Sequence, residues 1–415
     1  MNLSEELKWR GFVNQTTIKD FTILDNTIIT FYWGVDPSAD SMQIGNLAAG
    51  MMARAFMKHG HKAVLLVGGA TGMIGDPDGK AQERDLLSLE QIEKNKTSIA
   101  NQYKQIFDGM EFTIVDNYDW FKSINYLDFL RDVGKHVPMR TMLGREFVQT
   151  RLSEDGAGIS YAEFSYSLIQ GYDFLHLYNN HDVTLQICGA DQWGNSIAGV
   201  DLIRRISGGE AHVWSTPLII NKATGKKFGK TEGGAIWLDS NKTSVFKFYQ
   251  FWINVDDEGV EDYMKVYTDL DKTTIEDIIS QHNEDKSARQ AQKRLAFEVT
   301  KIVHGEERAE SVRRVSDVLF GSAEYSILSE LDFAELKSEL LCKNVSSGEN
   351  LTDVLIKTNL ANSKTEARRF LEASAIYING SQLPLEKNML EADDFIHGYA
   401  VIRRGKNITA LLELE

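Results

Sequence analysis

Three polar side chains recur along one face of an otherwise apolar segment and have the chemistry to hold a small polar ligand. Residues 160–178 have helical apolar spacing, and Tyr166, Gln170 and Asp173 lie at i, i+4 and i+7, so a helix would bring them to one side. An aspartate can accept a hydrogen bond from a hydroxyl, and an amide can orient an ammonium group. The pattern indicates either a ligand site beside a core or the solvated face of a surface helix.

A second candidate site is the glycine-rich run at residues 67–80, VGGATGMIGDPDGK. Its glycines do not form the GxGxxG fingerprint of dinucleotide-binding folds. They do not form a phosphate-binding P-loop either, because the last two glycines are too close together and an alanine follows the lysine. The run predicts a turn at a strand end. Asp76, Lys80 and Arg84 favour a turn that lines a ligand pocket over one that serves packing alone.

The elements that must position these side chains alternate along the first half of the chain. Two apolar, β-branched runs, 27–33 and 63–67, flank a segment with helical spacing that ends at Gly60. A third short strand is expected at 183–188. Strand–helix–strand alternation with glycines after the strands predicts an α/β fold with a parallel sheet. The site is then expected at the carboxyl ends of the strands.

The chain beyond residue 243 has a different pattern. Residues 246–341 have helical apolar spacing, many charges and no proline, and Thr273 and Glu276 form a capping-box pair at an expected helix start. We therefore expect a small α-helical domain after the sheet.

The last part of the chain indicates a small mixed module behind a polar linker at 346–350. Ser363 and Glu366 form a further capping pair, and Asn379–Gly380 is a hairpin signal. The expected domains are 1–243, 244–345 and 351–415.

The composition is that of a folded protein with an acidic balance. Of 415 residues, 42 % are apolar and 25 % charged, and the net charge is −15, which excludes a generally basic coat for nucleic acid. It does not exclude local basic patches such as the four lysines of residues 222–230. The two cysteines, far apart and without a CxxC, favour neither a disulfide framework nor a zinc site. We expect a cytoplasmic protein without a signal segment or membrane span.

Six motifs occur in the order FYWGVDPSADSMQIGN, VGGATGMIGDPDGK, NYDWF, EFSYSLIQGYDF, CGADQWGN and KKFGKTEGGAIWLD. In this order the chain resembles the bacterial tyrosyl-tRNA synthetases, a family of class I aminoacyl-tRNA synthetases, over nearly its whole length. The resemblance implies a Rossmann-type catalytic domain, an anticodon-side helical domain and an α+β RNA-binding module. It also implies that L-tyrosine and ATP give tyrosyl-adenylate and pyrophosphate. The tyrosyl group then passes to the 3′-terminal ribose of tRNA(Tyr).

The resemblance implies a tyrosine site built from positions that match the family motifs. Tyr32 and Asp173 would meet the phenol, Asp76, Tyr166 and Gln170 the ammonium, and Asn117 and Gln192 the carboxylate. Buried polar groups of this kind favour a hydroxyl, because a phenylalanine would leave them unpaired.

The resemblance also implies an ATP site. It would contain Asp36, Gly45, Gly189, Asp191 and Lys230, with Mg²⁺ carried by ATP and no tightly bound cofactor or metal. Lys227, Lys230 and Thr231 match a mobile loop that would hold pyrophosphate as charge develops on it, although a basic loop alone is also typical of a solvated turn. Gln43 and Asn46 stand where the family usually has histidines. Side-chain amides can still donate to phosphate oxygens at a helix N-terminus.

The implied partners are tyrosine, ATP, tRNA(Tyr) and a second copy of the chain. Lys80 and Arg84 match a basic pair near the incoming tRNA end, and Lys364, Arg368 and Arg369 would meet tRNA phosphates from the last module. Two other interpretations stay open. One is a synthetase for tryptophan, suggested by the Gly-Asn pair at 45–46, and the other is a non-catalytic RNA-binding protein that keeps the fold.

Overall fold

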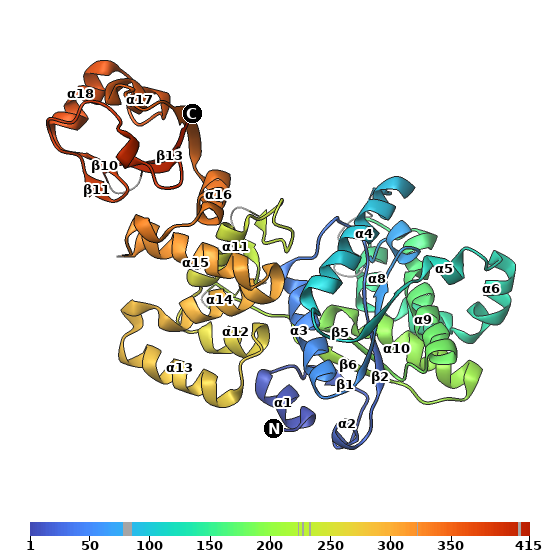
Figure 1. The fold of residues 1–415 in the computed structure, drawn as a ribbon. Coiled ribbons are helices and arrows are strands. Elements are labelled where there is room, and N and C mark those ends of the chain that lie inside the picture. Colours follow the sequence, from blue (N-terminus) through green and yellow to red (C-terminus); the bar gives the residue numbers. More distant parts are fainter. Residues whose placement is uncertain (78–84, 223, 226–227, 232–233, 322, 406–407) are drawn as a thin grey trace. The chain divides into compact units, whose positions relative to one another are not determined.

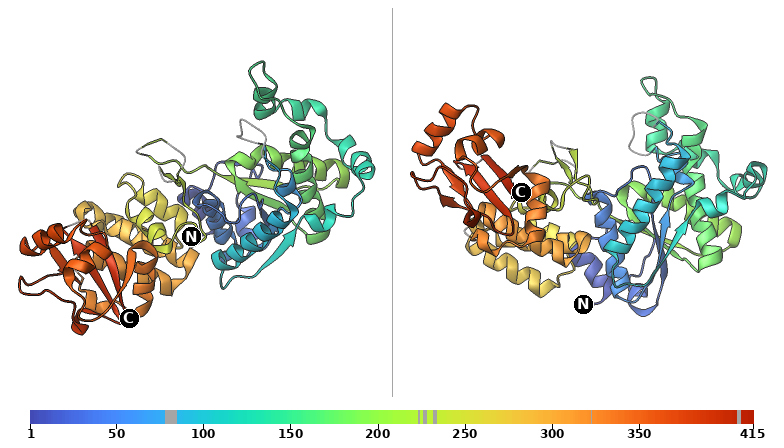
Figure 2. Two further views of the ribbon diagram at one scale, coloured as in Figure 1. Left: turned by 90° about the horizontal axis from the view of Figure 1, so that it is seen from above. Right: turned by 45° about the horizontal axis from the view of Figure 1, so that its top comes forward.

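The computed structural model describes residues 1–415 except 78–84, 223, 226–227, 232–233, 322 and 406–407 (Figures 1 and 2). Contacts within the chain divide it into two compact units. The first comprises Met1–Lys242 with Val255–Leu295, and the second comprises Thr243–Asn254 with Ala296–Glu415.

A six-stranded sheet forms the centre of the first unit (Figure 1). Its strands are β1 (Gln15–Thr16), β2 (Thr30–Val35), β3 (Lys62–Val67), β4 (Phe112–Asp116), β5 (Leu185–Gly189) and β6 (His212–Thr216). They lie in the order β1-β6-β5-β2-β3-β4, and all neighbours are parallel except β1 and β6. The strand order reverses between β2 and β5, and open α/β sheets bind ligands outside such a point. The predicted α/β fold with a Rossmann-type parallel sheet is confirmed.

Helices cover both faces of this sheet (Figure 1). The helices of the first unit are α1 (Leu3–Arg10), α2 (Ile23–Asn26), α3 (Ile44–Lys58), α4 (Leu89–Ile106), α5 (Tyr118–Phe121), α6 (Tyr126–Asp132), α7 (Met139–Leu143), α8 (Glu146–Leu152), α9 (Tyr161–His181), α10 (Trp193–Leu202), α12 (Val260–Tyr267) and α13 (Lys272–Glu284). Neighbouring side chains of a strand point to opposite faces. Phe31 accordingly packs on Phe56 of α3 and Tyr32 on Phe174 of α9, with ring centroids 5.3 and 5.2 Å apart.

Capping residues set where two of these helices begin. Helix α9 starts after Ser160, whose hydroxyl accepts from the Glu163 amide at 3.2 Å, so the helix predicted at 160–178 is confirmed and runs three residues further. Helix α13 starts after Asp271, whose carboxylate accepts from the Thr274 amide at 2.8 Å. The predicted capping pair of Thr273 and Glu276 is therefore wrong, because an aspartate two residues earlier already caps the helix.

The second unit contains helices and a five-stranded sheet. Its elements are α11 (Val245–Ile253), α15 (Glu306–Phe320), α16 (Glu330–Glu339), β9 (Leu341–Val345), α17 (Leu351–Lys357), α18 (Lys364–Glu372), β10 (Ile376–Ile378), β11 (Ser381–Gln382), β12 (Tyr399–Arg404) and β13 (Ile408–Leu414), and α14 (Gln290–His304) has residues in both units. The sheet order is β11-β10-β12-β13-β9.

Two local features of the second unit bear on the sequence predictions. Asn379 and Gly380 both have left-handed backbone, with φ of 45° and 78°, and join β10 to β11, which confirms the hairpin. Strand β9 pairs in parallel with β13, so residues 341–345, which the expected domain 244–345 includes, belong to the last sheet. The division into three domains stays a prediction.

Candidate active site

A cavity of about 440 Å³ opens at the carboxyl ends of the central strands of the first unit. It brings together residues from β2, the turn after β3, α9, the turn after β5 and the N-terminus of α3. The predicted site residues that line it are Tyr32, Asp36, Gln43, Gly45, Asn46, Asp76, Tyr166, Gln170, Asp173, Gly189, Asp191 and Gln192. Side chains that are distant in the sequence therefore meet where the strand order predicts a ligand.

The polar residues of α9 face this cavity and not the solvent. Tyr166 and Asp173 are only 4 % and 1 % exposed, and both line the cavity with Gln170. The alternative of a solvated helix face is therefore wrong. One face of α9, over about two turns, contributes a phenol, an amide and a carboxylate to a single wall.

The carboxylate of Asp173 is held by two donors behind the wall. The amide nitrogen of Asn117 donates to one oxygen at 3.0 Å, and the indole nitrogen of Trp120 donates to the other at 2.9 Å. Burial raises the pKa of Asp173 well above its ordinary value, and the two hydrogen bonds oppose that rise. Asn117 is fully buried and does not line the cavity. The contact of Asn117 with a substrate carboxylate stays a prediction. In the structure Asn117 holds the Asp173 carboxylate in place.

A second carboxylate, Asp36, joins β2 to the glycine-rich turn and to α9. It accepts from the Thr71 hydroxyl and from the Tyr166 phenol, both at 2.6 Å. A Cβ atom on Gly68 would lie 2.2 Å from the Asp36 carboxylate, so only glycine fits there. This close approach gives the physical reason for one glycine of the run. Thr71 and Asp76 of the same turn line the cavity, which confirms a pocket-lining turn.

Four buried polar atoms on the cavity wall have no hydrogen-bond partner within the described part of the protein. They are the Tyr32 hydroxyl, the side-chain oxygens of Gln170 and Gln186, and the Thr216 hydroxyl. Buried polar groups are nearly always paired, because an unmade hydrogen bond costs about 1–3 kcal/mol. Four of them around one cavity indicate a wall that a polar ligand completes.

Two of these four residues, Gln186 and Thr216, were not predicted from the sequence. Gln186 lies directly opposite Tyr32 in the register of β2 and β5, so both side chains point to the same face of the sheet. Thr216 ends β6 opposite Gly189. The one available signal for Gln186 was an amide inside the apolar strand run LQIC.

The side of the cavity next to α3 is formed by a helix N-terminus. Asn46 accepts a hydrogen bond from the backbone amide of Gln43 at 3.0 Å, which closes the first turn of the 15-residue helix. Backbone hydrogen bonds join the start of α3 to the segment 236–238. The Leu238 amide donates to the carbonyl of Met42, and the Ile44 amide donates to the carbonyl of Ile236. The positive end of the helix dipole thus faces the cavity.

The predicted lysine loop is only partly within the described residues. Lys227 lies outside them, as do Lys80 and Arg84. Lys230 and Thr231 form β7 (Lys230–Thr231), which pairs with β8 (Gly234–Ala235). Phe228 just before this hairpin lines the cavity and stacks on Tyr263, with ring centroids 4.2 Å apart.

The basic residues predicted for tRNA lie on α18 of the second unit. Lys364, Arg368 and Arg369 are all exposed, and Ser363 caps the helix by accepting from the Glu366 amide at 3.2 Å. Lys364 also pairs with Asp353 at 2.7 Å. One exposed face of a short helix therefore carries three cations.

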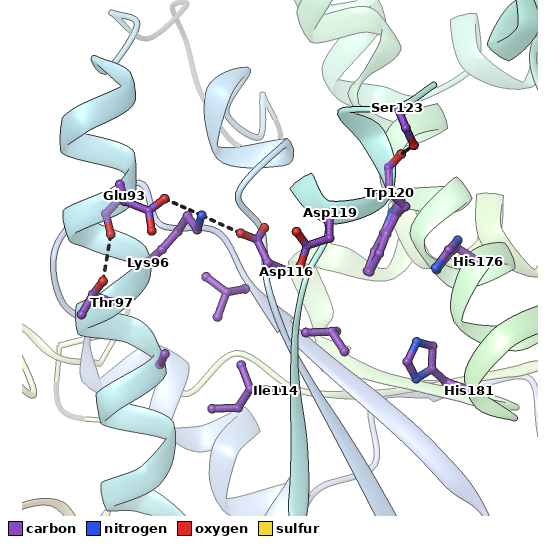
Figure 3. Close-up of a pocket in the computed structure, with 13 residues that line it drawn as sticks. Glu93, Lys96, Thr97, Ile114, Asp116, Asp119, Trp120, Ser123, His176 and His181 are labelled. Carbon is purple, nitrogen blue, oxygen red and sulfur yellow. Dashed lines mark hydrogen bonds and ion pairs between the residues drawn. The ribbon is translucent and has the colours of Figure 1, made fainter. Parts of the chain in front are cut away.

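A second cavity of about 760 Å³ lies on the far side of Trp120, over β4 (Figure 3). In it Lys96 bridges Glu93 and Asp116, each at 2.6 Å. Trp120 stacks on His176 with ring centroids 4.3 Å apart. The stacking on His176 holds the indole whose nitrogen donates to Asp173, so this region supports the wall of the first cavity.

Two features are absent from the part of the chain that the structure describes. None of their groups of histidine, cysteine, aspartate and glutamate is arranged to hold a metal ion. None of their helices combines the length and the apolar character needed to cross a membrane.

Comparison with known proteins identifies the class of protein to which this chain belongs. A family model described as tRNA synthetases class I (W and Y) matches residues 24–341, and one described as Tyrosine–tRNA ligase SYY-like C-terminal domain matches residues 332–412. The first match defines a class I aminoacyl-tRNA synthetase.

The relatives narrow this class. The chain is 42 % identical over 422 residues to Tyrosine–tRNA ligase of Bacteroides fragilis and 44 % identical over 419 residues to that of Geobacillus kaustophilus, with 98 % of each chain covered. A truncated mitochondrial tyrosyl-tRNA synthetase of Aspergillus nidulans superposes with a TM-score of 0.69 at 30 % identity, covering 77 % of this chain and 94 % of that one. The chain belongs to the tyrosine–tRNA ligase family.

Proposed function

We propose that the cavity binds L-tyrosine and ATP, forms tyrosyl-adenylate and releases pyrophosphate, and that the tyrosyl group then passes to tRNA(Tyr). The observation that carries this proposal is the buried Tyr32 hydroxyl, which has no hydrogen-bond partner among the described residues. It lies near enough to Asp173 for that charge to add to the effect of burial in raising the pKa of the Tyr32 phenol. A ligand phenol between the two would supply the missing hydrogen bond.

Other polar groups of the cavity wall are suited to the ammonium and carboxylate groups of an amino acid. Asp36 and Asp76 provide negative charge, and Tyr166 and Gln170 provide oriented dipoles, so an ammonium group would be held there. Gln192 donates to Asp76 at 2.5 Å and also lines the cavity. Its second N–H can face the tyrosine carboxylate.

ATP is proposed to lie along the side of the cavity formed by α3. Gly45 leaves room for close approach, and the N-terminus of a 15-residue helix favours phosphate. Gly189 and Asp191 would border the adenosine, and Mg²⁺ would come with the nucleotide. Lys227, Lys230 and Thr231 would hold the pyrophosphate.

The reaction needs positioning more than proton transfer. The tyrosine carboxylate is already ionised at neutral pH and attacks the α-phosphorus of ATP in line, and the bond to pyrophosphate breaks. No general base is required in this step. Charge that develops on the leaving group is met by the helix N-terminus and the lysine loop.

Transfer to tRNA is assigned to the second unit as well as the first. Exposed cations at Lys364, Arg368 and Arg369 would contact tRNA phosphates. In the full chain, Arg368→Ala with Arg369→Ala should leave tyrosyl-adenylate formation unchanged and weaken tRNA charging. An equal loss of both activities would contradict this division of labour.

A homodimer and a cytoplasmic location complete the proposal. From α6 to the start of α9 six large apolar side chains are exposed, namely Tyr126, Leu127, Met139, Leu143, Leu152 and Tyr161, and exposed apolar surface of this kind is typical of a protein interface. Light scattering should give the mass of a dimer for the wild type. A Leu127→Lys, Leu152→Lys variant should give the mass of a monomer.

The test of the proposed activity is amino-acid-dependent exchange of pyrophosphate into ATP. We expect exchange with tyrosine and little with phenylalanine or tryptophan. Exchange with tryptophan would favour the tryptophan synthetase, against the tyrosine-family match over residues 332–412. No exchange with any of the three would favour the non-catalytic RNA-binding protein.

A further inference from the structure

A row of hydrogen bonds runs from Arg145, next to the first turn of α8, to the cavity. The Arg145 guanidinium donates to the Asn195 oxygen at 2.7 Å, and the Asn195 amide nitrogen donates to the Gln192 oxygen at 3.2 Å. The Gln192 amide nitrogen then donates to Asp76 at 2.5 Å. A second Arg145 nitrogen donates to the carbonyl of Gly194 at 2.6 Å. The row therefore joins a loop residue to two predicted substrate contacts.

The two ends of this row fix the orientation of the amides between them. A guanidinium can only donate, so Asn195 must turn its oxygen toward Arg145 and its nitrogen toward Gln192. Gln192 must then accept through its oxygen and donate through its nitrogen to the carboxylate of Asp76. Asn195 is only 2 % exposed, so water has little access to replace either bond.

We propose that Arg145 is a positioning residue that makes Gln192 present an N–H, and not an oxygen, to the substrate carboxylate. The proposal rests on the function proposed above. With Arg145 in place, the second N–H of Gln192 faces the cavity. Without Arg145 no donor fixes the Asn195 oxygen, so Asn195 can turn that oxygen toward the Gln192 oxygen. Gln192 is then oriented by Asp76 alone, and a flip would set its oxygen against both the tyrosine carboxylate and Asp76.

Loss of Arg145 should affect only the binding of the ammonium and carboxylate groups of the ligand. The hydrogen bonds of Arg145 described above go to Asn195 and to the Gly194 carbonyl, and neither group belongs to the phenol site. Loss of the arginine should therefore weaken ligands that carry an ammonium or a carboxylate and leave a bare phenol unaffected. A residue that merely stabilises the fold would weaken all of them together.

The experiment compares four ligands in the full-length protein. Tyrosine, tyramine, 3-(4-hydroxyphenyl)propionate and 4-ethylphenol are measured by their dissociation or inhibition constants for the wild type and for Arg145→Met. We expect the variant to bind tyrosine roughly ten-fold more weakly, since a bond to a charged group is lost from the row. We expect 4-ethylphenol to bind equally well to both. Arg145→Lys keeps a donor and should recover most of the affinity for tyrosine.

Two variants serve as controls. Arg140→Met removes an exposed arginine from the same segment and should change no constant. Asn195→Leu breaks the row at its next link, so it should reproduce the ligand pattern of Arg145→Met. The double variant should then be no worse than the more affected single variant.

Three results would overturn the proposal. The first is an Arg145→Met variant that binds tyrosine as the wild type does. The second is a variant that loses affinity equally for tyrosine and 4-ethylphenol, which would indicate a structural role alone. A wild type that binds no tyrosine and catalyses no exchange would instead overturn the proposed function, and the proposal with it.

Discussion

Removal of one oxygen atom, by Tyr32→Phe, should stabilise the empty protein and weaken its binding of tyrosine. The Tyr32 side chain is 1 % exposed, and its hydroxyl has no partner in the part of the chain that the structure describes. A buried hydroxyl of this kind costs about 1–3 kcal/mol, so the free energy of unfolding should rise by about 1 kcal/mol. The hydrogen bond to a bound phenol is worth about 0.5–1.5 kcal/mol, so the dissociation constant for tyrosine should rise roughly two- to thirteen-fold.

Denaturant unfolding and calorimetric titration measure these two effects. Tyr103→Phe is the matched control, because Tyr103 is also fully buried but donates to the carbonyl of Leu66 at 2.9 Å and lies outside the cavity. That variant should lose about 1 kcal/mol of stability and keep its affinity for tyrosine. If Tyr32→Phe destabilises the empty protein as Tyr103→Phe does, the hydroxyl of Tyr32 is already paired and the reasoning fails.

Three other buried titratable groups, Asp173, His304 and Glu163, should each have a measurable effect on binding or stability. Because burial raises the pKa of Asp173, the affinity for tyrosine should fall at mildly acidic pH, where an ordinary aspartate is still ionised; a constant affinity from pH 8 to 5 would contradict this. Burial lowers the pKa of His304 from 6.5 to about 3, so the second unit should lose stability as the pH falls below 6.5, by up to about 1.4 kcal/mol per pH unit. His304→Gln should flatten that profile in denaturant unfolding, and an unchanged slope would count against it. Glu163→Gln should destabilise the first unit by about 3 kcal/mol because it removes the charge of a buried carboxylate that pairs with Arg151, whereas Arg131→Gln at an exposed pair should cost almost nothing.

The sequence predicted those parts of the fold that depend on local patterns. The stripe of Tyr166, Gln170 and Asp173 was recognisable because a helix repeats every 3.6 residues, and only its burial was undecided. The Asn379–Gly380 hairpin followed from the need for left-handed backbone at both positions. The capping pair at Thr273 was wrong because several polar residues compete for one cap, and spacing alone does not rank them.

The parts of the site that depend on three-dimensional pairing were not predictable from the sequence. Gln186 gives no periodic signal, and its place opposite Tyr32 comes from the register of two strands that are far apart in the chain. The support of Asp173 by Trp120 joins two helices. Arg145 acts through amides whose orientation is set only when both ends of the row are known.

The most direct test of the central claim is a crystal structure of the protein with bound tyrosine. The claim is that the unpartnered atoms of the cavity wall are completed by the substrate. It predicts the phenolic oxygen of the ligand at about 2.7–2.8 Å from both the Tyr32 hydroxyl and a carboxylate oxygen of Asp173. It also predicts the ammonium group beside Asp76 and Gln170. A tyrosine bound outside this cavity, or one that leaves the Tyr32 hydroxyl paired with water, would contradict it.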